Sequence, residues 1–129
     1  MVKLSDEEFE GAVQAAIDSI PQRFLDELDN IAFFVEDEPS AEQLEDPDGY
    51  VTEEGDMLGL YDGISLLDRA DGYGEIGDFP DSITIFKGPH ERLEGTKEEV
   101  LEEVRKTVIH EVAHYFGMDE DQVDAMGYA

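Results

Sequence analysis

One long segment, residues 96–116, constrains the fold most, because it has the pattern of a single helix with one apolar face. It opens with Thr96-Lys97-Glu98-Glu99, a capping box in which threonine and glutamate side chains satisfy free backbone N–H groups. Apolar residues then follow at helical spacing: Val100, Leu101, Val104, Val108, Ile109, Val112, Ala113 and Phe116. Such a stripe has to be buried against other elements, so the chain needs a further layer that covers this helix.

Helices and strands elsewhere in the chain supply that layer. A second capping box at Ser5 and helical periodicity predict a helix over residues 5–20, and a short helix restarts at Pro21 and ends near Asn30. Short runs of strand-forming residues predict strands at 31–35, 58–61, 64–67 and 82–86. An Asp62-Gly63 turn is expected to join the middle two strands as a hairpin, and the alternation in 82–86 indicates a half-buried strand. This order indicates an α+β fold, and residues 1–129 fit one domain.

The net charge of the chain excludes some classes of binding partner. The net charge is −27, from 35 Asp and Glu against 8 Lys and Arg. Nucleic acids and anionic membranes both require basic protein surface, so neither is expected as a partner. Residues 36–56 are acidic and interrupted by proline and glycine, which predicts a mobile loop. The chain has no cysteine, so any metal ligands would be histidine and carboxylate. Neither an apolar leader segment nor a long apolar run is present, so we expect a cytoplasmic protein.

The candidate site lies in the last turns of the long helix, where His110, Glu111 and His114 form the pattern HExxH. Residues i and i+4 lie one turn apart on the same helix face, so both imidazoles can reach a single cation. Glu111 lies one residue's rotation away, where its carboxylate can hold a metal-bound water and act as a general base, as in zinc peptidases. The structural alternative is a pair of core histidines beside an ion-paired glutamate. With only 3 histidines in the chain, a chance match is rare.

Zinc at an open catalytic site needs a third protein ligand, and the residues after the helix indicate where it comes from. Gly117 can adopt the left-handed conformation that ends a helix and reverses the chain. In the metzincin pattern HExxHxxGxxH, the third ligand follows the second histidine by six residues, and Glu120 occupies that position. A shift in register would place Asp121, or next Asp119, there instead. Acids that do not bind metal would cap a last helix over residues 121–126.

The segment HEVAHYFGMDEDQVDAMGY resembles the minimal zincin-like metallopeptidase family of small bacterial proteins. Four upstream segments resemble this family in the same order: DNIAFFVEDEP, LGLYDGISL, DSITIFKGP and VRKTVIHE. The resemblance implies a compact zincin-like domain with a small sheet packed on the HExxH helix. It also implies Zn2+ bound by His110 and His114, with Glu111 as the base. Zincins use an edge strand to pair with extended substrate, a role that we expect for residues 82–86.

Together these residues predict a zinc-dependent metallopeptidase whose substrate is a peptide or a small amide. Tyr115 and Tyr128 are candidates for stabilising the oxyanion, but core packing or a position at the rim of the site is the favoured interpretation for each. Two alternatives remain open. In the first, the protein is a catalytically weak zincin that serves as a zinc-stabilised binding module. In the second, it is an acidic interaction protein in which the histidines have no functional role. The sequence does not indicate the oligomeric state.

Overall fold

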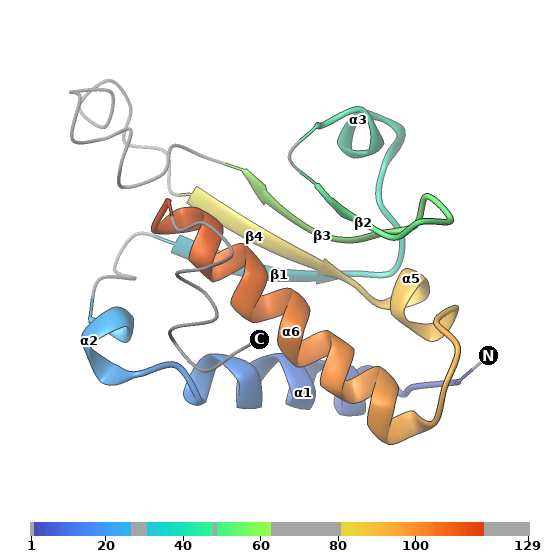
Figure 1. The fold of residues 1–129 in the computed structure, drawn as a ribbon, viewed down its shortest axis with the longest axis horizontal. Coiled ribbons are helices and arrows are strands. Elements are labelled where there is room, and N and C mark those ends of the chain that lie inside the picture. The colour runs from blue at the N-terminus through green and yellow to red at the C-terminus, as the bar shows by residue number, and fades with distance from the viewer. Residues whose placement is uncertain (1, 27–30, 48, 63–80, 118–129) are drawn as a thin grey trace.

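The computed structural model describes residues 2–26, 31–47, 49–62 and 81–117 (Figure 1). Its elements, in chain order, are α1 (Asp6–Asp18), α2 (Gln22–Leu25), β1 (Ile31–Glu36), α3 (Ala41–Leu44), β2 (Tyr50–Val51), β3 (Met57–Asp62), β4 (Asp81–Phe86), α5 (Lys87–Glu91) and α6 (Lys97–Tyr115). The described strands form one sheet in the order β1-β4-β3-β2. Strands β1 and β4 are parallel, and the other neighbours are antiparallel. The α+β class is therefore confirmed.

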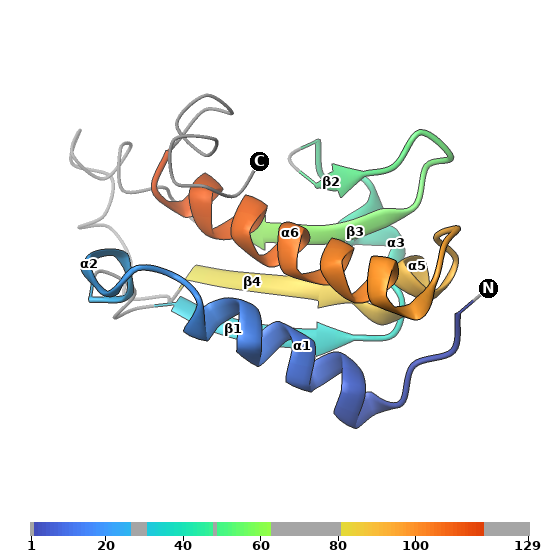
Figure 2. The ribbon, with the colours of Figure 1, turned by 60° about the horizontal axis from the view of Figure 1, so that its bottom comes forward.

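Both long helices begin where their capping boxes predict. The Ser5 hydroxyl accepts a hydrogen bond from the Glu8 N–H at 3.0 Å, and the Thr96 hydroxyl accepts one from the Glu99 N–H at 3.2 Å. Helices α1 and α6 lie side by side on one side of the sheet and run in the same direction (Figure 2). An ion pair between Lys97 and Glu8 joins their first turns. Helix α2 follows Pro21 as expected, but it ends at Leu25 with Asp26 as its C-cap, so the predicted end near Asn30 was too late.

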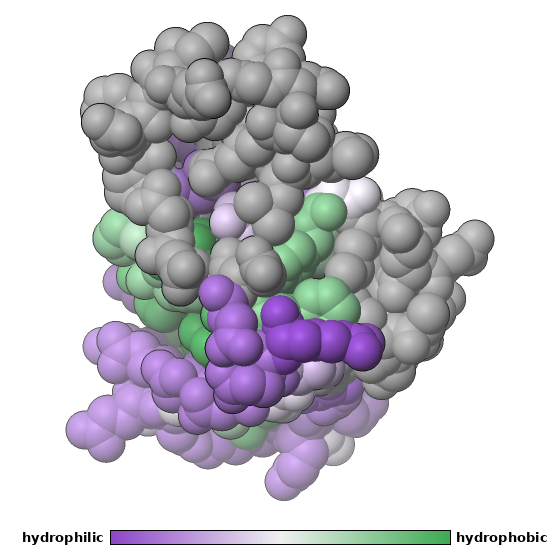
Figure 3. Space-filling model, turned by 90° about the vertical axis from the view of Figure 1, so that its left-hand side faces the viewer, coloured by the Kyte–Doolittle hydropathy of each residue, from purple (hydrophilic) through white to green (hydrophobic). Residues whose placement is uncertain are grey.

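The main core lies between these two helices and the sheet. Its buried apolar members are Leu4, Phe9, Val13, Ala16, Ile20, Tyr61, Ile83, Ile85, Val100, Val104, Val108, Ile109, Val112 and Tyr115. At one end of the core, the rings of Phe24 and Phe116 meet edge to face with centroids 5.3 Å apart. Figure 3 views the molecule from this end, where apolar surface gathers above a hydrophilic lower part. The apolar stripe of α6 is thus covered by a helix and a sheet together.

Two expectations about the sheet were wrong. Strand β4 lies between β1 and β3, so residues 82–86 have no free edge for pairing with a substrate. The same strand is almost fully buried, because Thr84 is only 6 % exposed and both neighbouring strands cover its sides. The prediction of a half-buried strand was wrong because the hydroxyl residues that alternate with the apolar ones are small enough to be buried as well. The predicted partner strand at 64–67, with its hairpin turn, lies outside the described residues.

The acidic segment 36–56 is more ordered than the predicted mobile loop. It contains α3, whose start is a capping box between Ser40 and Gln43, and the short strand β2. Arg92 binds both ends of the segment, with two hydrogen bonds of 2.8 Å to the Glu38 carboxylate and a contact of 3.0 Å to Asp56. The guanidinium holds the pKa of Glu38 below its usual value. The segment is thus fastened to the end of α5.

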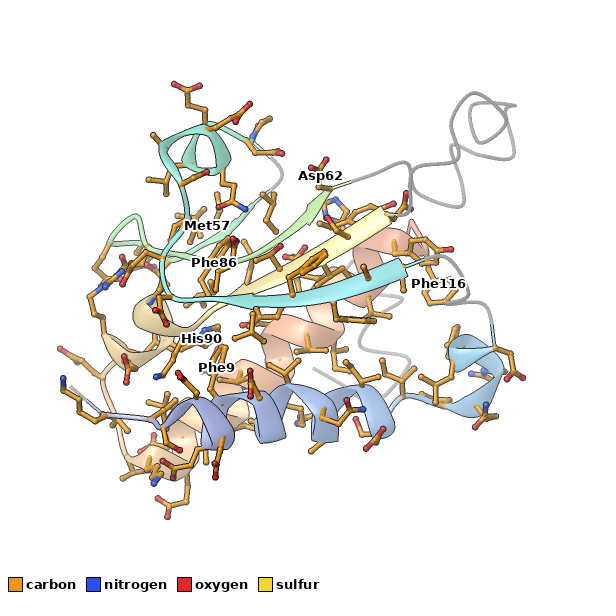
Figure 4. All side chains as sticks on the ribbon, turned by 180° about the vertical axis from the view of Figure 1, so that it is seen from behind. Phe9, Met57, Asp62, Phe86, His90 and Phe116 are labelled. Carbon is orange, nitrogen blue, oxygen red and sulfur yellow. The ribbon has the colours of Figure 1, made fainter. Side chains whose placement is uncertain are left out.

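His90 of α5 is buried between α1, β4 and α6 (Figure 4). Its Nδ1 donates a hydrogen bond to the Phe86 carbonyl at 2.7 Å, and its Nε2 lies 2.9 Å from the Thr107 hydroxyl. The ring of Phe9 packs on it at 5.7 Å. Burial lowers the pKa of His90 from 6.5 to about 4, because water no longer solvates the charged ring.

Acidification is therefore expected to destabilise the protein through His90. Between the unfolded pKa of 6.5 and the folded pKa of about 4, the unfolded state binds more protons, so stability falls as the pH drops. From about pH 7.5 to pH 5 the wild type should lose about 2 kcal/mol of unfolding free energy through this group, a loss that His90→Gln does not share. Urea unfolding of both proteins at the two pH values measures the difference. A difference that does not change with pH would contradict the expectation.

Candidate metal centre

Helix α6 carries the three HExxH residues in its last two turns. The His110 and His114 rings lie on one side of the helix with their centroids 6.5 Å apart, and both side chains are partly exposed. Glu111 projects between the helix and the sheet and is 0 % exposed. The helix ends with Phe116 as its C-cap, and Gly117 has a φ of 71°. The predicted left-handed conformation of Gly117 is confirmed, whereas the chain reversal expected after it lies outside the described residues.

The carboxylate of Glu111 is unusual for a buried charged group. Within the described part of the chain, neither of its oxygens has a hydrogen-bond partner. The Nδ1 of His114 lies 3.9 Å from Oε2, which is beyond hydrogen-bonding distance. Burying a carboxylate without partners is costly, and proteins normally place a hydrogen-bond donor, a cation or a water molecule beside it. This carboxylate is therefore arranged to receive such a partner.

Gly59 of β3 provides the space that Glu111 occupies. A Cβ atom at this position would lie 2.7 Å from Cγ2 of Thr107 and 3.2 Å from Cγ of Glu111. The first contact is shorter than packed carbon atoms adopt and the second is tighter than usual, so a side chain at position 59 would push the helix or its side chains away. The absence of a side chain in β3 thus lets α6 approach the sheet at the turn that carries the candidate base.

A tyrosine from a neighbouring strand packs against each histidine. Tyr50 of β2 stacks on His110 with centroids 4.2 Å apart and an interplanar angle of 24°. Tyr61 of β3 packs on His114 at 5.6 Å, tilted by 59°. The Tyr61 hydroxyl donates a hydrogen bond of 2.7 Å to the buried Asp81 carboxylate. Strands β2 and β3 therefore each place an aromatic ring against one of the two imidazoles.

The structure brings together only part of the predicted ligand set. In the ranges 2–26, 31–47, 49–62 and 81–117, no group of three or more His, Cys, Asp or Glu side chains is placed to hold a metal ion. The predicted third ligands lie outside the described residues: Glu120, Asp121 and Asp119. Tyr128 and the predicted helix 121–126 lie outside them too. Tyr115 is buried in the core, against Tyr61 and Phe116, as the packing interpretation predicted.

The residues present nevertheless fit zinc. Two imidazoles one helical turn apart are the donors that Zn2+ binds in open sites, and the buried carboxylate beside them lacks a donor within the described chain. A third carboxylate ligand would complete the set, and oxygen is an accepted zinc ligand.

Comparison with known proteins shows which family the chain belongs to. A model of zincin-like metallopeptidases matches residues 28–128. The chain belongs to this family. Membership of a zincin-like metallopeptidase family supports a hydrolase of the metallopeptidase class and implies zinc binding. A search of curated proteins found no match. No helix in the described parts of this zincin-like protein is long and apolar enough to cross a membrane.

Sequence reasoning missed the sheet residues that surround the zincin motif. Gly59, Tyr50 and Tyr61 lie far from the HExxH helix in the chain, and nothing in their local pattern predicts that they face it. Strand β2, which carries Tyr50, has only two residues and a register shift, so no alternation could be recognised. Asp81 was equally hidden, because an acid beside a turn region normally indicates exposure.

Proposed function

We propose that this protein is a zinc-dependent metallopeptidase in which His110 and His114 bind the metal and Glu111 is the general base. The observation that carries the proposal is the fully buried Glu111 carboxylate, which has no hydrogen-bond partner in the described chain and lies beside two histidines on one helix face. A structural glutamate in a core would be paired, because an unpaired buried charge is destabilising. Here the carboxylate is buried without such a pair, which favours a chemical role.

The roles of the residues follow from their chemistry. Zinc, when bound, supplies Lewis acidity toward a carbonyl oxygen and toward a water molecule. Glu111 accepts the proton of the attacking water and then returns it to the leaving amine nitrogen. Its burial excludes bulk water from the carboxylate, which strengthens its interaction with the attacking water molecule. Glu120 is our first choice for the third ligand, with Asp121 and then Asp119 as alternatives.

The substrate is proposed to be a peptide or small amide. An extended peptide needs a strand edge, and among the described strands β2 is an edge strand whose Tyr50 contacts His110. Strand β2 therefore replaces residues 82–86 in this role. The net charge of −27 favours basic segments over acidic ones, because opposite charge raises the rate of encounter.

A metal analysis joined to a cleavage assay tests the proposal. We expect the purified protein to retain about one equivalent of zinc after dialysis, since three ligands at an open site bind zinc tightly. It should cleave members of a peptide library, and basic peptides should react faster, with an advantage that shrinks as salt is added. A chelator should stop cleavage, and added Zn2+ should restore it.

The control is the double variant His110→Ala/His114→Ala, which keeps the acidic surface but removes both imidazoles. Zinc retention equal to that of this variant would refute the metal site. Zinc retention without cleavage of any peptide would instead support the zinc-stabilised binding module, which predicts a large loss of stability with chelator but no hydrolysis.

A further inference from the structure

The contact between Tyr50 and His110 differs from the other aromatic contacts around the site. Its rings are nearly parallel and 4.2 Å apart, whereas Tyr61 meets His114 at a tilt of 59° and 5.6 Å. A stacked neighbour leaves an imidazole free to slide within its own plane but prevents it from tilting out of that plane. The orientation of His110 is therefore set by a residue from another element.

Tyr50 is itself held in place by contacts that involve neither histidine. It pairs with Gly59 across the β2–β3 ladder, directly opposite the glycine that accommodates Glu111. Arg92 fastens both ends of the segment that carries Tyr50, through Glu38 before it and Asp56 after it. The strand that carries the aromatic ring is thus fastened to the folded scaffold at several points.

A His110 ring that Tyr50 holds in one orientation lowers the free-energy cost of metal binding. A free histidine side chain loses rotamer freedom when it binds a metal, and a scaffold that has already restricted the ring removes part of that loss. Metal-bound imidazole also carries part of the cation's charge, which the electron-rich face of tyrosine stabilises. Neighbours that orient metal ligands commonly change metal affinity by about 10–100-fold.

We infer that Tyr50 is a positioning residue for His110, so that the zinc affinity of the site depends on strand β2 as well as on helix α6. The inference rests on the proposed function, because it assumes that His110 is a metal ligand. Tyr50 itself is not expected to touch the metal. The inferred role belongs to its aromatic ring.

Three single variants test this inference through Zn2+ affinity, measured by competition with a chelating dye. Tyr50→Leu should weaken zinc binding by about 10-fold or more, because the stacked face is lost. Tyr50→Phe keeps that face and should stay within about twofold of the wild type. Val51→Ala is the matched control from the same strand, since Val51 is 46 % exposed, and it should also leave the affinity unchanged. Tyr50→Val, which suits an edge strand, replaces the leucine variant if that one does not fold.

The unfolding free energy of each metal-free variant separates positioning from simple structural support. If Tyr50 positions His110, Tyr50→Leu should lose more zinc affinity than a variant of strand β2, such as Val51→Ala, that has the same unfolding free energy. Equal affinities for Tyr50→Leu and wild type, or an equal loss in Tyr50→Phe, would overturn the inference and leave the proposed function standing. Zinc binding that depends on Tyr50 without any peptide cleavage would refute the proposed function and support the inference. A wild type that binds no zinc would refute both.

Discussion

Glu111→Gln is expected to reduce peptide hydrolysis by about 10²–10⁴-fold while zinc stays bound. Glutamine has nearly the same shape as glutamate, so the packing against Gly59 and Thr107 is retained. It cannot accept a proton from water, however, so the general base is lost. Because His110 and His114 are unchanged, zinc affinity should remain close to that of the wild type. Steady-state cleavage of the best library peptide, together with zinc titration, measures both effects.

The same substitution should increase the stability of the metal-free protein. The wild-type carboxylate is fully buried and has no hydrogen-bond partner in the described chain, and a neutral amide costs less to bury there than a charge. Glu103→Gln is the matched control, because Glu103 lies two turns earlier on the same helix and is partly exposed. It should alter neither activity nor stability appreciably. Full activity in Glu111→Gln would exclude Glu111 as the base.

Gly59→Ala is expected to destabilise the fold by about 1–3 kcal/mol, the usual effect of overpacking. The new Cβ would lie 2.7 Å from Cγ2 of Thr107, so α6 and β3 would have to separate. In an open position the same change would be stabilising, because alanine loses less backbone entropy on folding than glycine does. The sign of the effect therefore reports on the close approach, and thermal unfolding of the metal-free protein measures it.

Two further variants make this test specific. Gly11→Ala on α1 is the control, because a Cβ at this position would have no heavy atom within 4 Å outside its own helix turn, and it should be stabilising. Thr107→Ser removes the methyl group that meets the new Cβ and keeps the hydroxyl beside His90. The double variant Gly59→Ala/Thr107→Ser should recover part of the stability lost in Gly59→Ala. Equal stability of Gly59→Ala and wild type would show that the approach is not tight.

The long helices and the HExxH face were predictable because their signals are local. Capping boxes at Ser5 and Thr96 and periodic apolar residues determine where α1 and α6 begin and which face each buries. The same kind of signal was present at Ser40, where a capping box starts α3, but the acidic surroundings favoured a loop. Charge density describes solvation, and a short helix can be fully solvated.

The order of the strands was not predictable, because pairing joins residues that are distant in the chain. The edge position expected for residues 82–86 came from the resemblance to zincins, yet β1 and β3 pair with both edges of this strand. The aromatic support of the histidines depends on that arrangement, since Tyr50 and Tyr61 reach α6 only from correctly ordered strands. The local sequence pattern therefore predicted the HExxH residues, whereas the pairing of distant strands determines which side chains contact them.

The packing of α1 on α6 also has a consequence for synthesis on the ribosome. The apolar face of α1, including Phe9 and Val13, packs in one core with the residues of α6, among them Val104 and Val108, which emerge about 95 residues later. The parallel partner of β1, strand β4, likewise follows it by 50 residues in register, as the pairing of Ile31 with Asp81 shows. Neither contact can form until the later partner has emerged from the ribosome. The nascent chain thus leaves the ribosome with its first helix unpartnered, and its dense negative charge would then keep neighbouring unfolded copies apart.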